Sequence, residues 1–283
     1  MITSIVYSKD RPLQLDLCLQ SISKHFKQAS EVVVIYKASD LYRDSYDTLM
    51  KEHADVKFIE QSKSIFKDSL DVILSAKNEF VCFFTDDDIV YRQVPQIRED
   101  ILSEDKIECF SLRMGTNIAK RSHEGRCYPD TPIPQMLQVI DENNMCWAKT
   151  LREYGSYWSY SMSVDGHIFR KKQLQVMFDE MWYLSQRYTD WSQTPNKIES
   201  MMQRFWTDGK PLIASFMHSV VVNSPNNRVQ ESHLHNMFGE AYAYKADELL
   251  EKYLLGRRIN IDNLDFGQIE CPHTEINILK GLE

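Results

Sequence analysis

Three adjacent aspartates directly follow a strongly apolar stretch. Asp86, Asp87 and Asp88 come after the run Phe80-Val81-Cys82-Phe83-Phe84-Thr85. Neighbouring carboxylates beside a buried strand repel one another and lose solvation, which is costly without a counter-charge. A divalent cation offsets that cost, because Mg²⁺ and Mn²⁺ take one or two carboxylates together with phosphate oxygens of a substrate. The pattern therefore favours a metal and diphosphate site over its alternative, a solvated acidic turn.

The elements around these aspartates alternate between strand and helix patterns over residues 1–115. Apolar runs predict strands at 2–7, 32–36, 56–59, 80–84 and 108–114. Helix spacing follows Pro12, and further helices are expected at 41–53, from Phe66 to Leu74 and at 93–103. This alternation predicts an α/β fold with a mostly parallel central sheet flanked by helices. Ligands of such sheets bind beyond the carboxyl ends of the strands, which places residues 7–11, 36–40 and 85–88 on one rim.

The second half of the chain is less regular. Residues 115–160 contain three prolines and few periodic patterns, and we expect an irregular insertion there with one short helix at 134–142. A strand at 161–169, helices at 171–180 and 196–207, a strand at 212–223 and a C-terminal helix at 238–255 follow. We therefore expect one domain at 1–236, with a regular half (1–115) and a less regular half (116–236), and a helical extension at 237–283.

Composition narrows the class of protein. The net charge is -8, from 33 basic and 41 acidic residues, which disfavours nonspecific binding to nucleic acid. No apolar run reaches the roughly 18 residues of a membrane span, and the N-terminus enters a strand pattern without a signal-peptide pattern. The six cysteines form no CxxC pair, so a disulfide framework is not expected. We expect a cytoplasmic protein for which peripheral contact with a membrane stays open.

Several segments taken in order resemble GT-A nucleotide-sugar glycosyltransferases of the family-2 type, in which a DxD motif ends a central strand. Residues 4–12 occupy the place of the opening strand and its "TYNR"-like turn. Residues 166–171 resemble the glycine-containing strand and basic turn, and Ile198-Glu199-Ser200 resembles the acidic helix start. The three aspartates also resemble the exostosin-like transferases, so inversion and retention of configuration both stay open. The resemblance implies a Rossmann-like GT-A fold over about residues 2–225, with a nucleotide-binding half at 1–115 and an acceptor or catalytic half at 116–236.

The resemblance also implies roles for individual residues. Glu199 is the expected general base, with Asp190 as its rival, and Asp86 and Asp88 are the expected metal ligands. His218 and His233 lie where many members of the class place a further metal ligand. Residues expected to bind the nucleotide sugar are Tyr7, Lys9, Asp10, Arg11, Asp40, Lys67, Asp86, Asp87, Asp165, Gly166 and Arg228.

Two groups of residues are expected to act on the open side of the site. Arg228 is expected to grip a phosphate, and the segment 224–245 is expected to be mobile until a donor binds. The aromatic residues of the insertion either form an acceptor wall or anchor the loop in the core. They are Trp147, Tyr154, Tyr157, Trp158 and Tyr160.

The implied activity is transfer of a sugar from a nucleoside-diphosphate donor to a saccharide or lipid-linked acceptor in the synthesis of surface polysaccharide. The implied cofactor is Mn²⁺ or Mg²⁺. Two alternatives stay open. One is a nucleotidyltransferase that forms nucleotide sugars, although such enzymes usually carry a glycine-rich loop after the first strand and residues 7–12 contain no glycine. The other is a noncatalytic relative that binds a saccharide or nucleotide.

Overall fold

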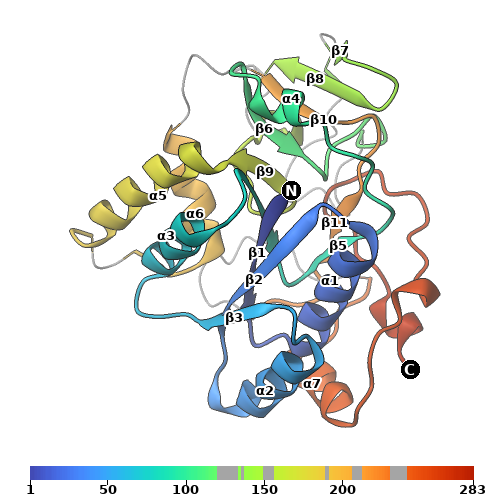
Figure 1. Ribbon diagram of the computed structural model, residues 1–283. Helices are drawn as coiled ribbons and strands as arrows, with labels where there is room; N and C mark the ends of the chain where they lie inside the picture. Colours follow the sequence, from blue (N-terminus) through green and yellow to red (C-terminus); the bar gives the residue numbers. More distant parts are fainter. Residues whose placement is uncertain (120–132, 135–136, 149–155, 189–190, 206–211, 230–240) are drawn as a thin grey trace.

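A nine-stranded mixed sheet forms the centre of the part of the chain that the computed structural model describes, which is residues 1–119, 133–134, 137–148, 156–188, 191–205, 212–229 and 241–283 (Figure 1). Its strand order is β3-β2-β1-β4-β9-β6-β10-β8-β7, and β5 pairs with β11 in a separate two-stranded ladder. The strands are β1 Ile2–Lys9, β2 Ala29–Lys37, β3 Lys57–Glu60, β4 Phe80–Thr85, β5 Asp88–Val90, β6 Ile107–Ser111, β7 Gln138–Val139, β8 Asn144–Ala148, β9 His167–Arg170, β10 Leu212–Phe216 and β11 Val221–Asn223.

The N-terminal half of the sheet is parallel. β1 pairs in parallel with both β2 and β4, and β2 pairs in parallel with β3. β9 lies antiparallel between β4 and β6, and β6 is again parallel to β10. The central strand β1 is buried along almost its whole length, as expected of a parallel strand covered on both faces. The expected α/β layout with a mostly parallel central sheet flanked by helices is confirmed.

The helices form two groups on either side of these strands. In Figure 1, α1, α2 and α7 lie together on one side, and α3, α5 and α6 lie on the other. The α-helices are α1 Pro12–His25, α2 Arg43–Glu52, α3 Ile65–Ser75, α4 Glu99–Ser103, α5 Lys171–Ser185, α6 Pro195–Met202 and α7 Ala246–Leu254. Pro12 and Pro195 occupy the first turns of α1 and α6, where a missing N–H costs no hydrogen bond. The helical connections thus change from one face of the sheet to the other between β1 and β4. The aspartates lie on the rim of the sheet at this point.

Local hydrogen bonds prevent helix formation in parts of two segments that were expected to be helical. The helix expected at 93–103 is helical only as α4, because the backbone N–H of Val94 and that of Ile97 donate to the loop at residues 25–28. The helix expected at 134–142 is wrong for residues 137–142. Gln138–Val139 forms β7 instead, and the side chain of Asp141 accepts from the backbone of Asn143 and Asn144 in the turn to β8. Turn-forming side chains of this kind compete with a helix.

Two expected strands also differ, and both differences shape the site. The strand expected at 161–169 begins only at His167, and residues 161–166 cross the rim instead. Gly166 permits this with a φ of +68°. The strand expected at 212–223 is divided into β10 and β11, and β11 leaves the main sheet to pair with β5. That pairing sets Asn223 opposite Asp88.

The C-terminal helix is shorter than expected, and the rest of the extension runs beside β11. Residues 241–245 are not helical, since the backbone N–H groups of Ala241 and Tyr242 donate to the Glu275 carboxylate. Asn223 forms a β-bridge with His273, and Asn226 donates to the carbonyl oxygen of Ile276. The extension thereby supports the segment that follows β11. The short 3₁₀ helices are η1 Asp40–Tyr42, η4 Tyr157–Ser159, η5 Gln203–Phe205, η6 Ile261–Asn263 and η7 Ile278–Gly281.

Gly115, which follows β6, packs against the turn between β10 and β11. It allows the two backbones to approach each other closely. A Cβ atom on this residue would lie 2.3 Å from the backbone nitrogen of Ser219 and 2.6 Å from the carbonyl carbon of His218. We expect Gly115→Ala to lower the free energy of unfolding by roughly 3 kcal/mol, at the upper end of overpacking costs. Gly256→Ala is the control, because its Cβ meets nothing within 4 Å and only its φ of +80° costs about 1 kcal/mol. Equal losses in urea unfolding would contradict the close approach.

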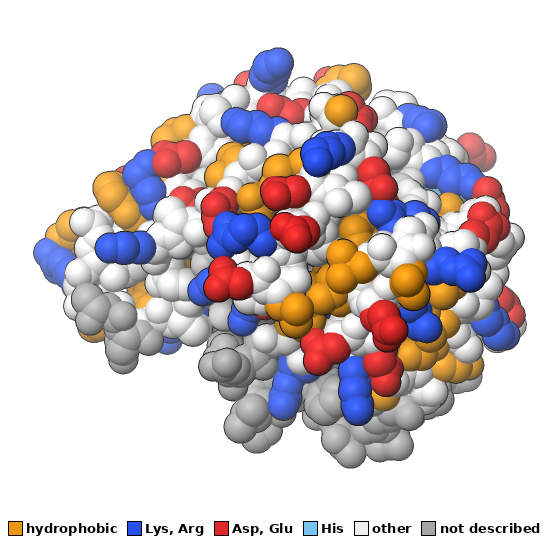
Figure 2. Space-filling view, turned by 90° about the horizontal axis from the view of Figure 1, so that it is seen from below, with side chains coloured by type: hydrophobic (Ala, Val, Ile, Leu, Met, Phe, Trp, Pro, Cys, Tyr) orange, Lys and Arg blue, Asp and Glu red, His pale blue; other side chains and the backbone are white. Residues whose placement is uncertain are grey.

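The end of the molecule that carries α2 and α7 has a mixed surface. Figure 2 looks onto this end and shows basic and acidic side chains interspersed, with apolar side chains among them. Leu41, Leu254 and Leu255 are among the exposed apolar residues. Interspersed charges are typical of a solvated face, so this end is not organised as a single-sign binding surface.

Candidate active site

A cavity of about 670 Å³ lies on the rim at the carboxyl ends of β1, β2 and β4. Five basic and four acidic side chains line it, although acidic residues outnumber basic ones in the whole chain. The basic ones are Lys9, Arg11, Lys37, Arg113 and Arg228, and the acidic ones are Asp86, Asp87, Asp165 and Glu199. This gathering of cations favours an anionic ligand.

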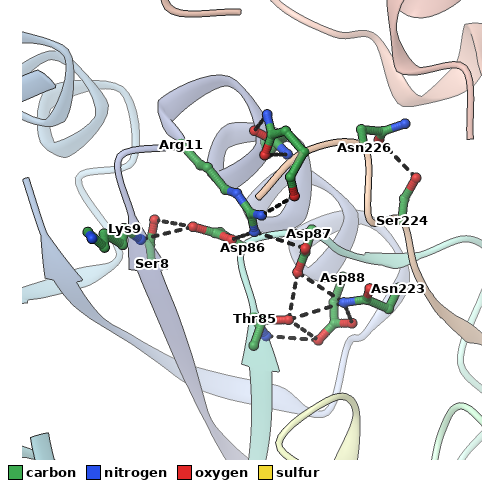
Figure 3. A network of polar contacts seen from close by, with 12 residues as sticks. Ser8, Lys9, Arg11, Thr85, Asp86, Asp87, Asp88, Asn223, Ser224 and Asn226 are labelled. Atoms are coloured by element: carbon green, nitrogen blue, oxygen red, sulfur yellow. Dashed lines mark hydrogen bonds and ion pairs between the residues drawn. The ribbon is translucent and has the colours of Figure 1, made fainter. Parts of the chain in front are cut away.

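Asp86 and Asp87 direct one carboxylate oxygen each at the same nitrogen of Arg11 (Figure 3). Arg11 Nη1 lies 2.9 Å from Asp86 Oδ1 and 2.8 Å from Asp87 Oδ2. The other oxygen of Asp86 accepts from the Ser8 hydroxyl and the Lys9 backbone. Each carboxylate is thus oriented by the protein on one side and turned toward a cationic atom on the other.

Asp88 is placed differently from its two neighbours. Its side chain is fully buried and is not among the residues that line the cavity. Asp88 Oδ2 accepts from the backbone N–H of Thr85 at 2.8 Å, and Oδ1 accepts from Asn223 Nδ2 at 3.1 Å. The structure therefore gives Asp88 the position of a residue that shapes the turn between β4 and β5, whereas Asp87 reaches the cavity.

Burial changes the proton affinity of two of the aspartates. Burial, opposed by the charge of Arg11 and aided by Asp87, raises the pKa of Asp86 to about 6. Burial, together with the charges of Asp165 and Asp87, raises the pKa of Asp88 well above its ordinary value. Asp88 is therefore held by hydrogen bonds at a buried position that disfavours its charged form.

Glu199, on α6, lines the same cavity. Its Oε1 accepts from the Ser163 hydroxyl at 2.7 Å and from the Val164 backbone at 2.9 Å, and Tyr160 donates to Oε2 at 3.3 Å. Burial and the nearby charge of Asp165 raise its pKa to about 7, against the opposing charge of Arg113. A carboxyl group with a pKa near 7 in a cavity is suited to general acid or base chemistry.

Asp165 lies between the acidic pair and Glu199 and stays ionised. Arg113 Nη1 donates to Asp165 Oδ2 at 2.8 Å, and His273 Nε2 lies 3.8 Å from the same oxygen. Burial alone would raise the pKa of Asp165, but its contact with His273 and the charge of Arg113 lower it to about 2. His273 Nδ1 lies 3.0 Å from the hydroxyl of Tyr157, so the histidine connects the C-terminal extension to this carboxylate.

The structure brings together many, but not all, of the residues expected from the sequence. Those that line the cavity are Tyr7, Lys9, Arg11, Asp86, Asp87, Asp165, Glu199 and Arg228. Gly166 adjoins Asp165 and bonds to the end of β4 through its backbone N–H. Tyr157 and Tyr160 also line the cavity, whereas Trp147 and Trp158 are buried in the core. Asp190, His233 and Tyr154 lie outside the described residues.

Four expected site residues lie away from the cavity. Asp10 accepts from the backbone N–H of Ser39, and Asp40 is fully exposed beside Arg43. Lys67 pairs with Asp71 along α3, and the exposed His218 lies in the turn between β10 and β11. Arg113, Asn223 and His273 are among the members of the site that the sequence did not indicate. Their contacts span from 52 to 138 residues of sequence, so local patterns carry little signal for them.

The segment 224–245, which is expected to be mobile, begins with residues that are packed against their neighbours. Ser224, Asn226 and Asn227 are buried, and the Ser224 backbone N–H donates to the carbonyl oxygen of Asp87. Asn226 is held by carbonyl oxygens of Tyr242 and Ile276. These polar bonds fix the strip without the apolar face on which the expectation depended. Residues 230–240 lie outside the described residues.

Neither models of protein families nor curated proteins match the chain. Among solved structures, the chain is similar to S. aureus TarS 1–349 in complex with UDP, with 15% identity over 76% of this chain and 60% of that chain and a TM-score of 0.41. The galactosyltransferase LgtC, in complex with donor and acceptor sugar analogues, gives 12% identity over 75% and 73% of the two chains and a TM-score of 0.39.

A cytidylyltransferase from Leptospira borgpetersenii is also similar, with 12% identity over 90% of this chain and 94% of that chain and a TM-score of 0.37. The chain spans 29% of a longer TarS structure and 60% of TarS 1–349. These likenesses concern the α/β fold alone. In the described residues, we find no helix that is both long and apolar enough to cross a membrane.

Proposed function

We propose that the protein is a glycosyltransferase that moves a sugar from a nucleoside-diphosphate donor to a saccharide or lipid-linked acceptor in surface-glycan synthesis. The observation that carries the proposal is one shared cavity, which holds an acidic pair and several cations at the sheet rim together with the half-buried Glu199, whose pKa is about 7. A diphosphate suits the first group, and deprotonation of an acceptor hydroxyl suits the second.

A divalent cation fits the pair formed by Asp86 and Asp87. One oxygen of each converges on Arg11 Nη1, which stands in for a positive ion at that point. In the described residues no group of three or more side chains of His, Cys, Asp or Glu forms a complete metal cage. Two carboxylate oxygens suit Mg²⁺ or Mn²⁺ that completes its coordination with phosphate oxygens and water. When bound, such a cation neutralises charge on the departing diphosphate.

The chain's own residues take the other roles. Lys9 and Arg228 line the cavity and supply positive charge for phosphate groups. Ionised Asp165 accepts hydrogen bonds from sugar hydroxyls, and Glu199 accepts the proton of the acceptor hydroxyl. Tyr160, which is half-buried in the cavity lining, is the aromatic side chain on which a saccharide can pack, whereas Tyr157 is buried against His273 and Arg113.

The test of this proposal is a thermal-shift panel of nucleoside diphosphates, nucleoside triphosphates and nucleotide sugars, each with and without Mn²⁺. We expect a nucleoside diphosphate and its sugar conjugates to raise the melting temperature when Mn²⁺ is present. A ligand at 100 times its dissociation constant adds about 2.7 kcal/mol, which is readily detected. A shift confined to a triphosphate would favour the nucleotidyltransferase instead. A panel without any shift would contradict both.

His273 gives a second prediction at this site. We expect His273→Ala to lower kcat/KM by roughly ten- to a hundredfold, because a contact to a charged group is worth about 1.5–3 kcal/mol. The measurement is the rate of nucleoside-diphosphate release. His53→Ala is the matched control, since His53 pairs with Asp16 and neither residue lines the cavity. If the two variants lose equal activity, His273 acts only through the fold.

A further inference from the structure

Arg11 occupies the point at which a cation would meet the acidic pair. Its Nη1 contacts Asp86 Oδ1 and Asp87 Oδ2, and its side chain is only 11% exposed. The remaining oxygens of both carboxylates are already engaged. Asp86 Oδ2 accepts from Ser8 and Lys9, and Asp87 Oδ1 accepts from Thr85 and Asn223. A cation that takes one oxygen from each carboxylate must therefore compete with Arg11.

The guanidinium group is held in this place by the surrounding chain. Arg11 Nη2 donates to the carbonyl oxygen of Asn227 at 2.5 Å, and the Asn227 side chain exchanges hydrogen bonds with Gln14 on α1. The backbone N–H of Arg11 donates to the hydroxyl of Tyr46. Arg11 is thus a fixed counter-charge of the free protein, not a side chain that happens to lie near the acids.

We infer that Arg11 keeps divalent cations out of the acidic pair until a nucleoside diphosphate enters, and then turns from the carboxylates to the phosphates. This inference rests on the proposed function and adds to it an order of binding. A cation alone gains two carboxylate oxygens but displaces a buried ion pair and meets a like charge. A diphosphate supplies oxygens to the cation and also a bidentate partner for the released guanidinium.

The consequence is strong positive coupling between metal and diphosphate. The bound diphosphate pairs with the guanidinium group that the cation displaces, so each ligand lowers the free energy of binding of the other. Coupling of this kind is reciprocal. Movement of Arg11 also breaks its bond to Asn227, which adjoins Arg228 in the strip after β11. Arrival of the diphosphate is thereby linked to the wall of the cavity that carries a further cation.

The experiment measures Mn²⁺ binding by the electron paramagnetic resonance signal of the free ion, in the absence and presence of uridine or guanosine diphosphate. For the parent we expect Mn²⁺ to bind about ten- to a hundredfold more weakly alone than with the diphosphate. For Arg11→Gln we expect Mn²⁺ alone to bind about tenfold more tightly than to the parent, and the coupling to shrink. Lys37→Gln is the control. Lys37 also lines the cavity, and its replacement removes the same charge at a point away from the acidic pair.

Three outcomes separate this inference from the proposed function. Equal binding of Mn²⁺ alone to the parent and Arg11→Gln overturns the role of Arg11 while leaving the metal site in place. Equal tightening in Lys37→Gln and Arg11→Gln also overturns it, since net charge would then explain the effect. Diphosphate binding that is the same in EDTA and in Mn²⁺ overturns the proposed metal site itself. If Arg11→Gln fails to fold, Arg11→Lys provides the test, because one ammonium group cannot donate to both the carboxylates and Asn227 with the same fork geometry.

Discussion

Replacing Glu199 by glutamine is expected to lower turnover by roughly two to four orders of magnitude, the contribution of a positioned general base. Glutamine has nearly the same shape, and its carbonyl oxygen can still accept from Ser163 and Val164. Binding of the donor should therefore persist, because the acidic pair and the lining cations are unchanged. The measurement pairs the rate of diphosphate release with the donor's dissociation constant.

A matched control separates the carboxylate from its surroundings. Tyr160→Phe removes one donor to Glu199 Oε2 but keeps both the carboxylate and the ring. We expect a loss of less than about tenfold, the worth of one neutral hydrogen bond. If Glu199→Gln retains activity and Asp190→Asn does not, the base is Asp190. If neither substitution matters, transfer with retention of configuration becomes the better explanation.

The same carboxyl group predicts how activity depends on pH. Burial and the charge of Asp165 raise the pKa of Glu199 to about 7, so the group is protonated at pH 5 and ionised at pH 9. A general base acts only when ionised. We therefore expect kcat to rise tenfold per pH unit below 7 and to level off above it, in the range where the donor site stays intact. A profile that is flat from pH 5 to pH 8 would argue against Glu199 as the base.

Linkage gives a test that needs no acceptor. A raised pKa in the folded protein means that Glu199 contributes stability fully below its ordinary pKa of 4.5 and loses that contribution as pH rises through about 7. Glutamine cannot ionise and keeps its contribution. Glu199→Gln should thus become more stable than the parent by about 1–3 kcal/mol between pH 5 and pH 8. A constant difference in stability would show that the carboxylate is not strained by burial.

The second large effect concerns the acidic pair. We expect Asp87→Asn to weaken Mn²⁺-dependent binding of nucleoside diphosphate at least a hundredfold, because a charged ligand oxygen is lost from the cation. Asp86→Asn should do the same. Asn keeps the hydrogen bonds that Asp87 Oδ1 accepts, so the fold should survive. Calorimetric titration of diphosphate in the presence of Mn²⁺ provides the measurement.

Asp88→Asn is the control for this prediction. Asp88 does not line the cavity, and its carboxyl group accepts hydrogen bonds from Thr85 and Asn223 in the turn between β4 and β5, so its replacement changes that turn and no group that lines the site. We expect its diphosphate affinity to stay within about threefold of the parent, since polar contacts outside a binding site contribute little. A loss as large as that of Asp87→Asn would return Asp88 to the role of a metal ligand, as the sequence resemblance implied.

Local patterns were sufficient for most of the N-terminal half of the fold, and the helix expected at 93–103 is the exception. Strands such as β1 and β4 are apolar along their length, and Pro12 begins α1, so neighbouring residues specify the elements. The second half depends on contacts that no local pattern contains. β10 and β11 form one apolar run in the sequence, yet Asn117 bonds to Ser219, 102 residues away, in the turn between the two strands, and Gly115 leaves room for that turn.

The site divides along the same line. Asp86, Asp87 and Glu199 were predicted because each lies at the end of a recognisable element. Arg113 and His273 were not, since their partner Asp165 is 52 and 108 residues away and neither has a motif. Local patterns also did not indicate that Asp87, and not Asp88, lines the cavity. Only the pairing of β5 with β11 decides which carboxylate is turned inward.

The most direct test of the account follows the phosphorus atoms of a nucleotide sugar. Phosphorus NMR would monitor the donor selected by the thermal-shift panel, incubated with the protein, Mn²⁺ and either an acceptor extract or pyrophosphate. We expect nucleoside diphosphate to be the product, formed by the parent but not by Glu199→Gln. We expect no product whose formation depends on pyrophosphate. Formation of nucleoside triphosphate from pyrophosphate would contradict the account and identify a nucleotidyltransferase.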